Sequence, residues 1–222
     1  MKFETSCSDQ AGKAYFALEF LREAYKNGKL QEIAYHEVAH ALLLHKYKQN
    51  FNFYKAAFGK ECASGLARFF PVDENDEKSE IYFQRIEISL AGYVATKLIF
   101  KRLDGGCTND LQEARDYAVK LVNKLGFIGP ECVLPWFSND RRMETDISKR
   151  RNEKAIKKLI KRSMKSVKKY LSSHMNQIVR LGKLMMEKGF INSVDLENVM
   201  NPAKLIESST IATSAILVSS QI

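Results

Sequence analysis

The sequence predicts a mainly α-helical protein with one small β-sheet. Apolar residues recur at helical spacing through most of the chain, whereas the stretch 51–72 carries closely spaced aromatic residues interrupted by glycine. With 222 residues, 45% of them hydrophobic, and only 4 prolines, the chain is long enough to bury a core but contains little linker material. We therefore expect one α+β domain with short additions at its ends.

The first part of the chain divides into two helices and a sheet. Residues 11–27 have an amphipathic pattern that stops at a glycine, so we assign 1–29 to a separate N-terminal helix. A second helix is expected from about 30 to 48. In 51–72, the aromatic residues and glycines predict the short strands of the sheet, which end at Pro71.

Helices dominate the remainder, which we expect to form a C-terminal bundle. The expected elements are a loop over 73–80, a helix over 81–99, a break at Gly105-Gly106, a helix over 109–125, a loop over 127–146, a helical region over 147–188 with a break near Ser172-Ser173, and a short helix over 194–200. Asn109 is the predicted N-cap of the helix over 109–125. The main domain is assigned to 30–201, and the tail 202–222, which has no helical period, is expected to be disordered or to lie on the surface.

Composition restricts the location of the protein. No apolar run reaches the length of about 18 residues needed to span a bilayer, and the N-terminus lacks the apolar stretch of a secretion signal. Cys7, Cys62, Cys107 and Cys132 are widely separated, which predicts neither a disulfide framework nor a thiolate zinc knuckle. These features favour a reducing, cytoplasmic location.

The formal net charge of +9 is concentrated in one segment. Residues 149–169 contain eleven Lys and Arg and one acid, Glu153, for a charge of +10, so the rest of the chain carries −1. Such a segment is usually a solvated helix face. The alternative is a docking surface for nucleic acid, anionic lipid or an acidic partner. Nucleic acid is not expected, because no aromatic residue interleaves with the charges before Tyr170.

One motif points to metal chemistry. His36 and His40 lie four residues apart in an apolar helical segment, so both imidazoles can reach one ion, and Glu37 lies about 100° round the helix. Two neutral imidazoles suit Zn²⁺, which lowers the pKa of a bound water towards about 7, and a nearby carboxylate can then accept the proton. The alternative is a plain helix with two half-buried histidines.

A catalytic zinc requires a third protein ligand. His45 lies five residues beyond His40, His174 lies in the basic helical region, and Asp110 stands at the predicted start of a helix after a Gly-Gly break. Acids are common at helix starts because they interact favourably with the helix dipole, so Asp110 has an ordinary structural explanation as well. Spacing alone does not separate these candidates.

These residues resemble the peptidase domain of the FtsH-type AAA zinc metalloproteases. The segment 34–41 (AYHEVAHA) is similar to that family's Ala-Tyr-His-Glu-Ala-Gly-His-Ala, and 65–71 (GLARFFP) to its Gly-x-x-x-x-x-Pro strand. Further similarities cover 89–100, 106–126 and 184–200, in the same order. The resemblance implies a zincin-like HExxH helix, zinc held by His36, His40 and Asp110, and Glu37 as the catalytic base.

Three features depart from that family. The 222 residues contain no Gly-x-x-x-x-Gly-Lys-Ser/Thr run of an ATPase module and no membrane segment. The family's Ala-Glu-Glu, whose acid supports the zinc site, is replaced by Ala95-Thr96-Lys97. Loss of such a supporting group commonly costs about 10 to 100-fold in affinity or activity.

We expect a zinc metalloendopeptidase that hydrolyses unfolded or partner-delivered polypeptides without ATP. Substrate is expected to pair as an extended strand beside residues 65–70. The alternative is a catalytically impaired module that binds peptides or partner proteins. The resemblance also suggests a homo-oligomer, and the basic segment 149–169 could receive an acidic partner or a separate AAA ATPase.

Overall fold

The structure, a computed structural model, describes residues 28–59, 64–73, 78–101, 105–129, 132–133 and 146–202. Over these residues it is mainly helical with one small antiparallel sheet, which confirms the predicted fold class. The helix expected over 11–27 and the tail beyond residue 202 lie outside the described residues.

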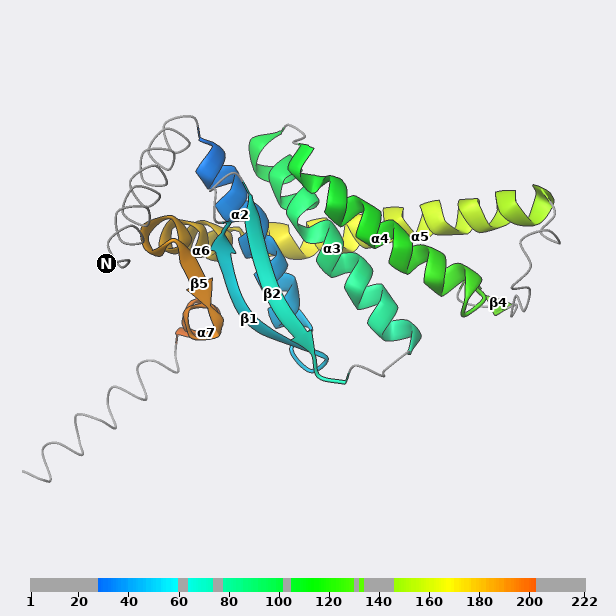
Figure 1. The fold of residues 1–222 in the computed structure, drawn as a ribbon, viewed down its shortest axis with the longest axis horizontal. Coiled ribbons are helices and arrows are strands. Elements are labelled where there is room, and N and C mark those ends of the chain that lie inside the picture. The colour runs from blue at the N-terminus through cyan, green and yellow to red at the C-terminus, as the bar shows by residue number, and fades with distance from the viewer. Residues whose placement is uncertain are drawn as a thin grey trace, which may run out of the picture.

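Helix α2 (Lys29–Lys46) is the central element of the fold (Figure 1). Its segment 38–44 is apolar apart from His40, and every residue of that segment is buried. A helix that is apolar on all sides requires cover on all sides. Helix α3 (Ser79–Phe100), helix α6 (Met175–Lys188) and the sheet supply that cover. The histidine motif therefore overlaps the part of α2 that is packed on all sides.

The sheet has the strand order β2-β1-β5. Strands β1 (Phe51–Phe58) and β2 (Gly65–Pro71) pair as a hairpin, which confirms the strands predicted in 51–72. Strand β5 (Phe190–Asn192) pairs with the other edge of β1 and leaves β2 as an edge strand. The sequence did not predict β5, because three residues are too few to show a period of two.

A second group of helices packs against α3. Helix α4 (Thr108–Asn123) follows the 3₁₀ turn η1 (Gly105–Cys107), and helix α5 (Asp146–Ser173) contacts both α3 and α4. The side chains that fill this second core are buried and mostly aliphatic: Ile86, Leu90, Ala114, Ala118, Leu121, Val122, Ile156 and Leu159. This packing holds the first turn of α4 in a fixed position relative to α3.

The C-terminal elements end where the sequence signals predict. Helix α5 ends at Ser173, which confirms the expected break near Ser172-Ser173. Helix α6 ends at Gly189, whose φ of 79° lies in the left-handed region that glycine adopts readily. Helix α7 (Ser193–Met200) follows, and Asn192 and Asp195 form a reciprocal capping box at its start.

Two local predictions are wrong. Asn109 is not the N-cap of α4: the helix begins at Thr108, after Cys107, and no side chain caps it, because the turn η1 leads directly into the helix. The segment 127–146 is also not entirely a loop. Strands β3 (Phe127–Gly129) and β4 (Cys132–Val133) pair there as a small separate ribbon, too short to show a strand pattern in the sequence.

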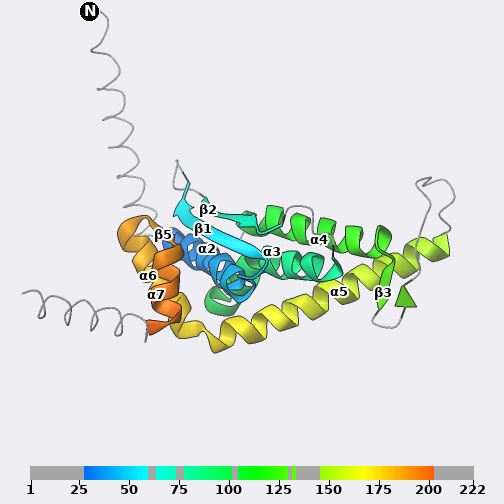
Figure 2. The same ribbon diagram turned by 90° about the horizontal axis from the view of Figure 1, so that it is seen from below.

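The two sides of the α2–α3 layer carry different elements. The β1–β2 hairpin lies on one side of this layer and α5 runs along the other (Figure 2). Among the described helices, none combines the length and the apolar character that crossing a bilayer requires.

Candidate metal centre

Two histidines of α2 and one aspartate of α4 converge on a single point. The Nε2 atom of His36 lies 2.8 Å from Oδ2 of Asp110, and Nε2 of His40 lies 3.2 Å from the same oxygen. The two Nε2 atoms are 3.1 Å apart. One donor atom from each residue thus falls within 4.8 Å of the other two. The first turn of α4 brings Asp110 against one face of α2, where residues at i and i+4 lie one above the other.

The second ring nitrogen of each histidine has its own neighbour. His40 Nδ1 lies 2.8 Å from the backbone carbonyl oxygen of Ile88 on α3. When Nδ1 donates its proton to this carbonyl, the lone pair of Nε2 faces the point of convergence. His36 Nδ1 lies 3.8 Å from the sulfur of Cys107, which is buried. The orientation of His40 is therefore fixed by backbone, without a supporting carboxylate.

The electrostatics of the cluster favour positive charge at this point. Burial lowers the pKa of His40, but its hydrogen bond and charge interaction with Asp110 outweigh burial and raise the pKa to about 9. Burial also raises the pKa of the Asp110 carboxyl, yet hydrogen bonds with His36 and His40 hold that pKa well below its usual range. Two imidazole nitrogens and one carboxylate oxygen around a point that prefers positive charge fit a divalent ion such as Zn²⁺.

Glu37 lies beside the cluster without joining it. Its side chain is 6% exposed, and burial raises the pKa of its carboxyl, although His40 and His36 act in the opposite direction. The backbone amide of Ala67 on β2 donates a hydrogen bond to this carboxylate. A carboxylate with a raised pKa, held between the edge strand and the histidines, is suited to accept and release a proton.

Two glycines make room for these side chains. A Cβ atom on Gly65 would overlap the carboxyl group of Glu37, and a Cβ atom on Gly92 would overlap the imidazole ring of His36. Any other residue at either position would force the neighbouring side chain to move. The sequence alone does not reveal these contacts, because Gly65 lies on β2 and Gly92 on α3, whereas Glu37 and His36 lie on α2.

His36 and Asp110 of the cluster, together with Glu37, line a cleft of about 340 Å³ between α2, β2 and the start of α4. Thr96 of α3 also lines it and is buried, with its hydroxyl donating to the Gly92 carbonyl oxygen at 3.0 Å. Lys97 is exposed and stacks on Tyr93 of its own helix. Neither residue supplies a carboxylate to the histidines, and the Ile88 carbonyl is the group that supports His40.

The other two histidines are held elsewhere. His45 Nε2 lies 3.1 Å from Glu197 Oε1, between α2 and α7. His174 Nδ1 lies 2.9 Å from the carbonyl oxygen of Tyr170, at the junction of α5 and α6. Neither belongs to the cluster, and Asp110 is the one of the three candidates that the structure brings to His36 and His40.

The chain matches the model of peptidase family M41 over residues 23–199. Among similar proteins, it is 26% identical over 177 residues to the ATP-dependent zinc metalloprotease FtsH 1 of Sphaerobacter thermophilus, with 74% of this chain and 27% of that protein covered. It is 27% identical over 185 residues to the ATP-dependent zinc metalloprotease FtsH of Methylococcus capsulatus, with 77% and 29% covered. The chain thus spans less than a third of the length of these relatives. Because the family match extends over most of the sequence, the chain belongs to peptidase family M41.

Proposed function

We propose that the chain is a zinc metalloendopeptidase in which His36, His40 and Asp110 hold Zn²⁺ and Glu37 is the catalytic base. The observation that carries this proposal is the convergence of three donor atoms within 4.8 Å beside a buried glutamate that is not one of them. A binding module would have no need of a separate buried glutamate beside the three donor atoms. Family membership and the names of the zinc metalloproteases it resembles support the same function.

Each residue of the site has a separate role in the proposed reaction. Zn²⁺ held by His36, His40 and Asp110 would supply a Lewis acid for the scissile carbonyl and the attacking water. Glu37 then accepts the proton of the attacking water and passes it to the leaving amine. The Ala67 amide holds the Glu37 carboxylate beside the cleft, and the Ile88 carbonyl holds Nε2 of His40 towards His36 and Asp110, where the ion would be bound.

We propose that substrate enters as an extended polypeptide beside β2. This strand forms one edge of the sheet, and Gly65 and Leu66 line the cleft next to Glu37. Pairing of backbone with backbone reads no particular side chain and so suits a peptidase of broad specificity. Substitution of Ala67 by proline would be an ambiguous test, because its amide also binds Glu37. Peptides that are N-methylated at single backbone positions test the pairing directly, and hydrolysis should fall at alternate positions.

The remaining proposals concern the setting of the enzyme. We propose that it acts on unfolded polypeptides, or on ones delivered by a partner, and that its own hydrolysis requires no ATP. A cytoplasmic location agrees with the wide separation of the four cysteines along the sequence, which suggests no disulfide framework. A homo-oligomer is supported by the outer face of the hairpin, which exposes Tyr54, Leu66, Phe70 and Val72.

The deciding experiment compares the native chain with Glu37→Gln. The variant should bind as much zinc and unfold at a similar temperature, but its hydrolysis of an unfolded polypeptide should fall by orders of magnitude, because a base is lost and not a ligand. Glu187→Gln, which removes an exposed carboxylate on α6, is the matched control and should remain active. Equal turnover by native and Glu37→Gln protein would rule out this base, and no turnover by either would favour a peptide-binding role.

A further inference from the structure

Helix α5 carries a continuous cationic surface. Ten of its residues between positions 150 and 169 are Lys or Arg, and all ten are exposed. We call them the basic stripe: Arg150, Arg151, Lys154, Lys157, Lys158, Lys161, Arg162, Lys165, Lys168 and Lys169. At a rise of 1.5 Å per residue, the stripe is about 29 Å long.

The stripe faces directly away from the core. At 100° per residue, its ten side chains fall within an arc of about 140° on the helix. Every position between 150 and 169 on that arc is Lys or Arg. The buried residues of α5 lie about opposite on the helix: Asn152, Ile156, Leu159, Ser163, Val167 and Leu171. The apolar face of this amphipathic helix is thus covered by the protein itself, and only charge is presented to the surroundings.

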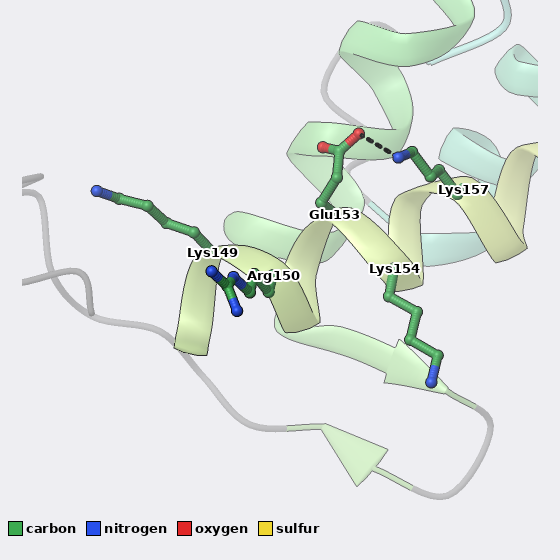
Figure 3. A pocket seen from close by; sticks show the side chains of 5 residues that line it. All are labelled: Lys149, Arg150, Glu153, Lys154 and Lys157. Atoms are coloured by element: carbon green, nitrogen blue, oxygen red, sulfur yellow. Dashed lines mark ion pairs between the residues drawn. The ribbon is translucent and has the colours of Figure 1, made fainter. Parts of the chain in front are cut away.

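Within the part of the chain that the structure describes, acidic side chains do not neutralise the stripe. Glu153, the one acid between 149 and 169, lies on the flank of the arc and is bound by both terminal nitrogens of Arg115, at 3.2 and 3.1 Å. Among the described residues, Lys157 is the one member of the stripe within 4.0 Å of a carboxylate, at 3.9 Å from Glu153. Figure 3 shows Glu153 turned towards Lys157, while Arg150 and Lys154 project away from it. The described residues thus leave nearly all the charge of the stripe to a partner.

We propose that the basic stripe binds the surface of a bilayer containing anionic lipids. Seven of the ten cations are lysines. Lysine acts as a hydrated point charge that suits a diffuse layer of headgroups, whereas arginine is preferred for bidentate recognition of individual phosphates. Each Lys or Arg near an anionic surface strengthens binding by about fivefold. A straight row about 29 Å long allows many such contacts to form at once.

The first turn of α5 favours lipid over nucleic acid. Ile147 falls on the same arc as the stripe, immediately before it, and is 82% exposed. An apolar side chain at that point can enter the headgroup region of a bilayer but has no partner on a phosphate backbone. Between 147 and 169, the arc of the helix that carries the stripe has no aromatic residue for stacking on bases and no Asn or Gln to read base edges.

Binding through α5 would leave the candidate active site open. The hairpin that borders the cleft lies on the side of the α2–α3 layer opposite to α5 (Figure 2). A bilayer against the stripe would therefore not cover the cleft, and polypeptides near the membrane surface could still reach Glu37. Membrane binding itself does not depend on whether the chain hydrolyses peptides, so the two proposals can fail separately.

The test is cosedimentation of the purified chain with vesicles of phosphatidylcholine alone or mixed with phosphatidylglycerol. Binding is expected only with the vesicles that contain phosphatidylglycerol. Raising the salt concentration from about 0.1 M to about 1 M should abolish this binding by screening. Replacing Lys158, Lys161 and Lys165 together by glutamine should weaken binding by about a hundredfold. Ile147→Ser should weaken it by a smaller factor at the same salt.

The control removes the same charge from other surfaces. Lys120, Arg180 and Lys183 are exposed on α4 and α6, and their joint replacement by glutamine should leave vesicle binding within a fewfold of native. Circular dichroism confirms that each variant is folded. Equal losses in the two triple variants would show that net charge and not the stripe is responsible. Absence of binding to anionic vesicles, or tighter binding to duplex DNA, RNA or an acidic polypeptide at the same salt, would overturn the proposal.

Discussion

Gly65 faces the carboxyl group of Glu37 so closely that a Cβ atom would overlap it. Gly65→Ala should therefore displace the base while leaving the histidines in place. A displacement of about 1 Å can cost about 100-fold in rate, so kcat should fall by about 10 to 100-fold. Zinc content, measured by atomic absorption after dialysis, should stay equal to that of the native chain. A fully active Gly65→Ala variant would show that Glu37 has no fixed position in the reaction.

Gly92 provides the matched comparison, because its missing Cβ would overlap the ring of His36. Gly92→Ala should weaken zinc binding by about 10 to 100-fold, the range found when groups around a ligand are disturbed. Competition with a chromogenic chelator measures this affinity. Gly65→Ala should thus lower the rate of hydrolysis, whereas Gly92→Ala should weaken zinc binding. The assignment of His36 as a ligand would be contradicted if Gly92→Ala bound zinc as tightly as the native chain does.

Asp110→Asn tests the third ligand against its ordinary explanation as a helix-start acid. Loss of a charge at a helix N-terminus costs only about 0.3–1 kcal/mol of stability. Loss of a ligand should instead remove most of the bound zinc at metal concentrations that saturate the native chain. Asp116→Asn, on an exposed position of the same helix, is the control and should keep its metal. Native metal content in Asp110→Asn would leave Asp110 with a helix-start role only.

His45 should make the fold sensitive to acid. Burial lowers the pKa of this histidine despite the nearby carboxylate of Glu197. In the unfolded chain, a histidine has a pKa of about 6.5, so the unfolded chain binds this proton more readily than the folded chain does. Stability is therefore lost as the pH falls from about 6.5 towards the lower pKa of His45 in the folded chain. Between about pH 7 and pH 5, the free energy of unfolding in urea should decrease more for the native chain than for His45→Gln. Parallel decreases would exclude this contribution.

Hydrolysis should follow the unfolded population of a substrate. A folded domain is stable by about 5–15 kcal/mol, so few of its molecules are open to cleavage at any moment. The purified chain should degrade a permanently unfolded protein quickly and its stably folded counterpart slowly, at equal rates with and without ATP. Rapid loss of the folded substrate, or a clear dependence on ATP, would contradict the proposal.

Site residues that lie close together on one helix could be predicted from the sequence. Contacts between residues on different helices or strands could not. Helical periodicity places three of the candidate residues together, so they can be identified from the sequence alone: His36, Glu37 and His40. Spacing along the chain could not distinguish Asp110 from His45 and His174, because the approach of Asp110 to α2 depends on how α4 packs against α3. Family resemblance was needed to select it. The support of His40 by the Ile88 carbonyl comes from backbone, which leaves no residue signature. The same holds for β5, whose three residues carry no period of their own.

The pairing of β1 with β5 has a consequence for how the chain matures. Ala56 lies opposite Ile191, so the sheet joins segments that are separated by most of the domain. Contacts of such long range are slow to form, because a large loop must close before they stabilise anything. During synthesis, helices α5 and α6 and then β5 must leave the ribosome before this strand pair can form. We therefore expect the hairpin beside Glu37 to become rigid only after β5 has left the ribosome, which is later than His36, His40 and Asp110.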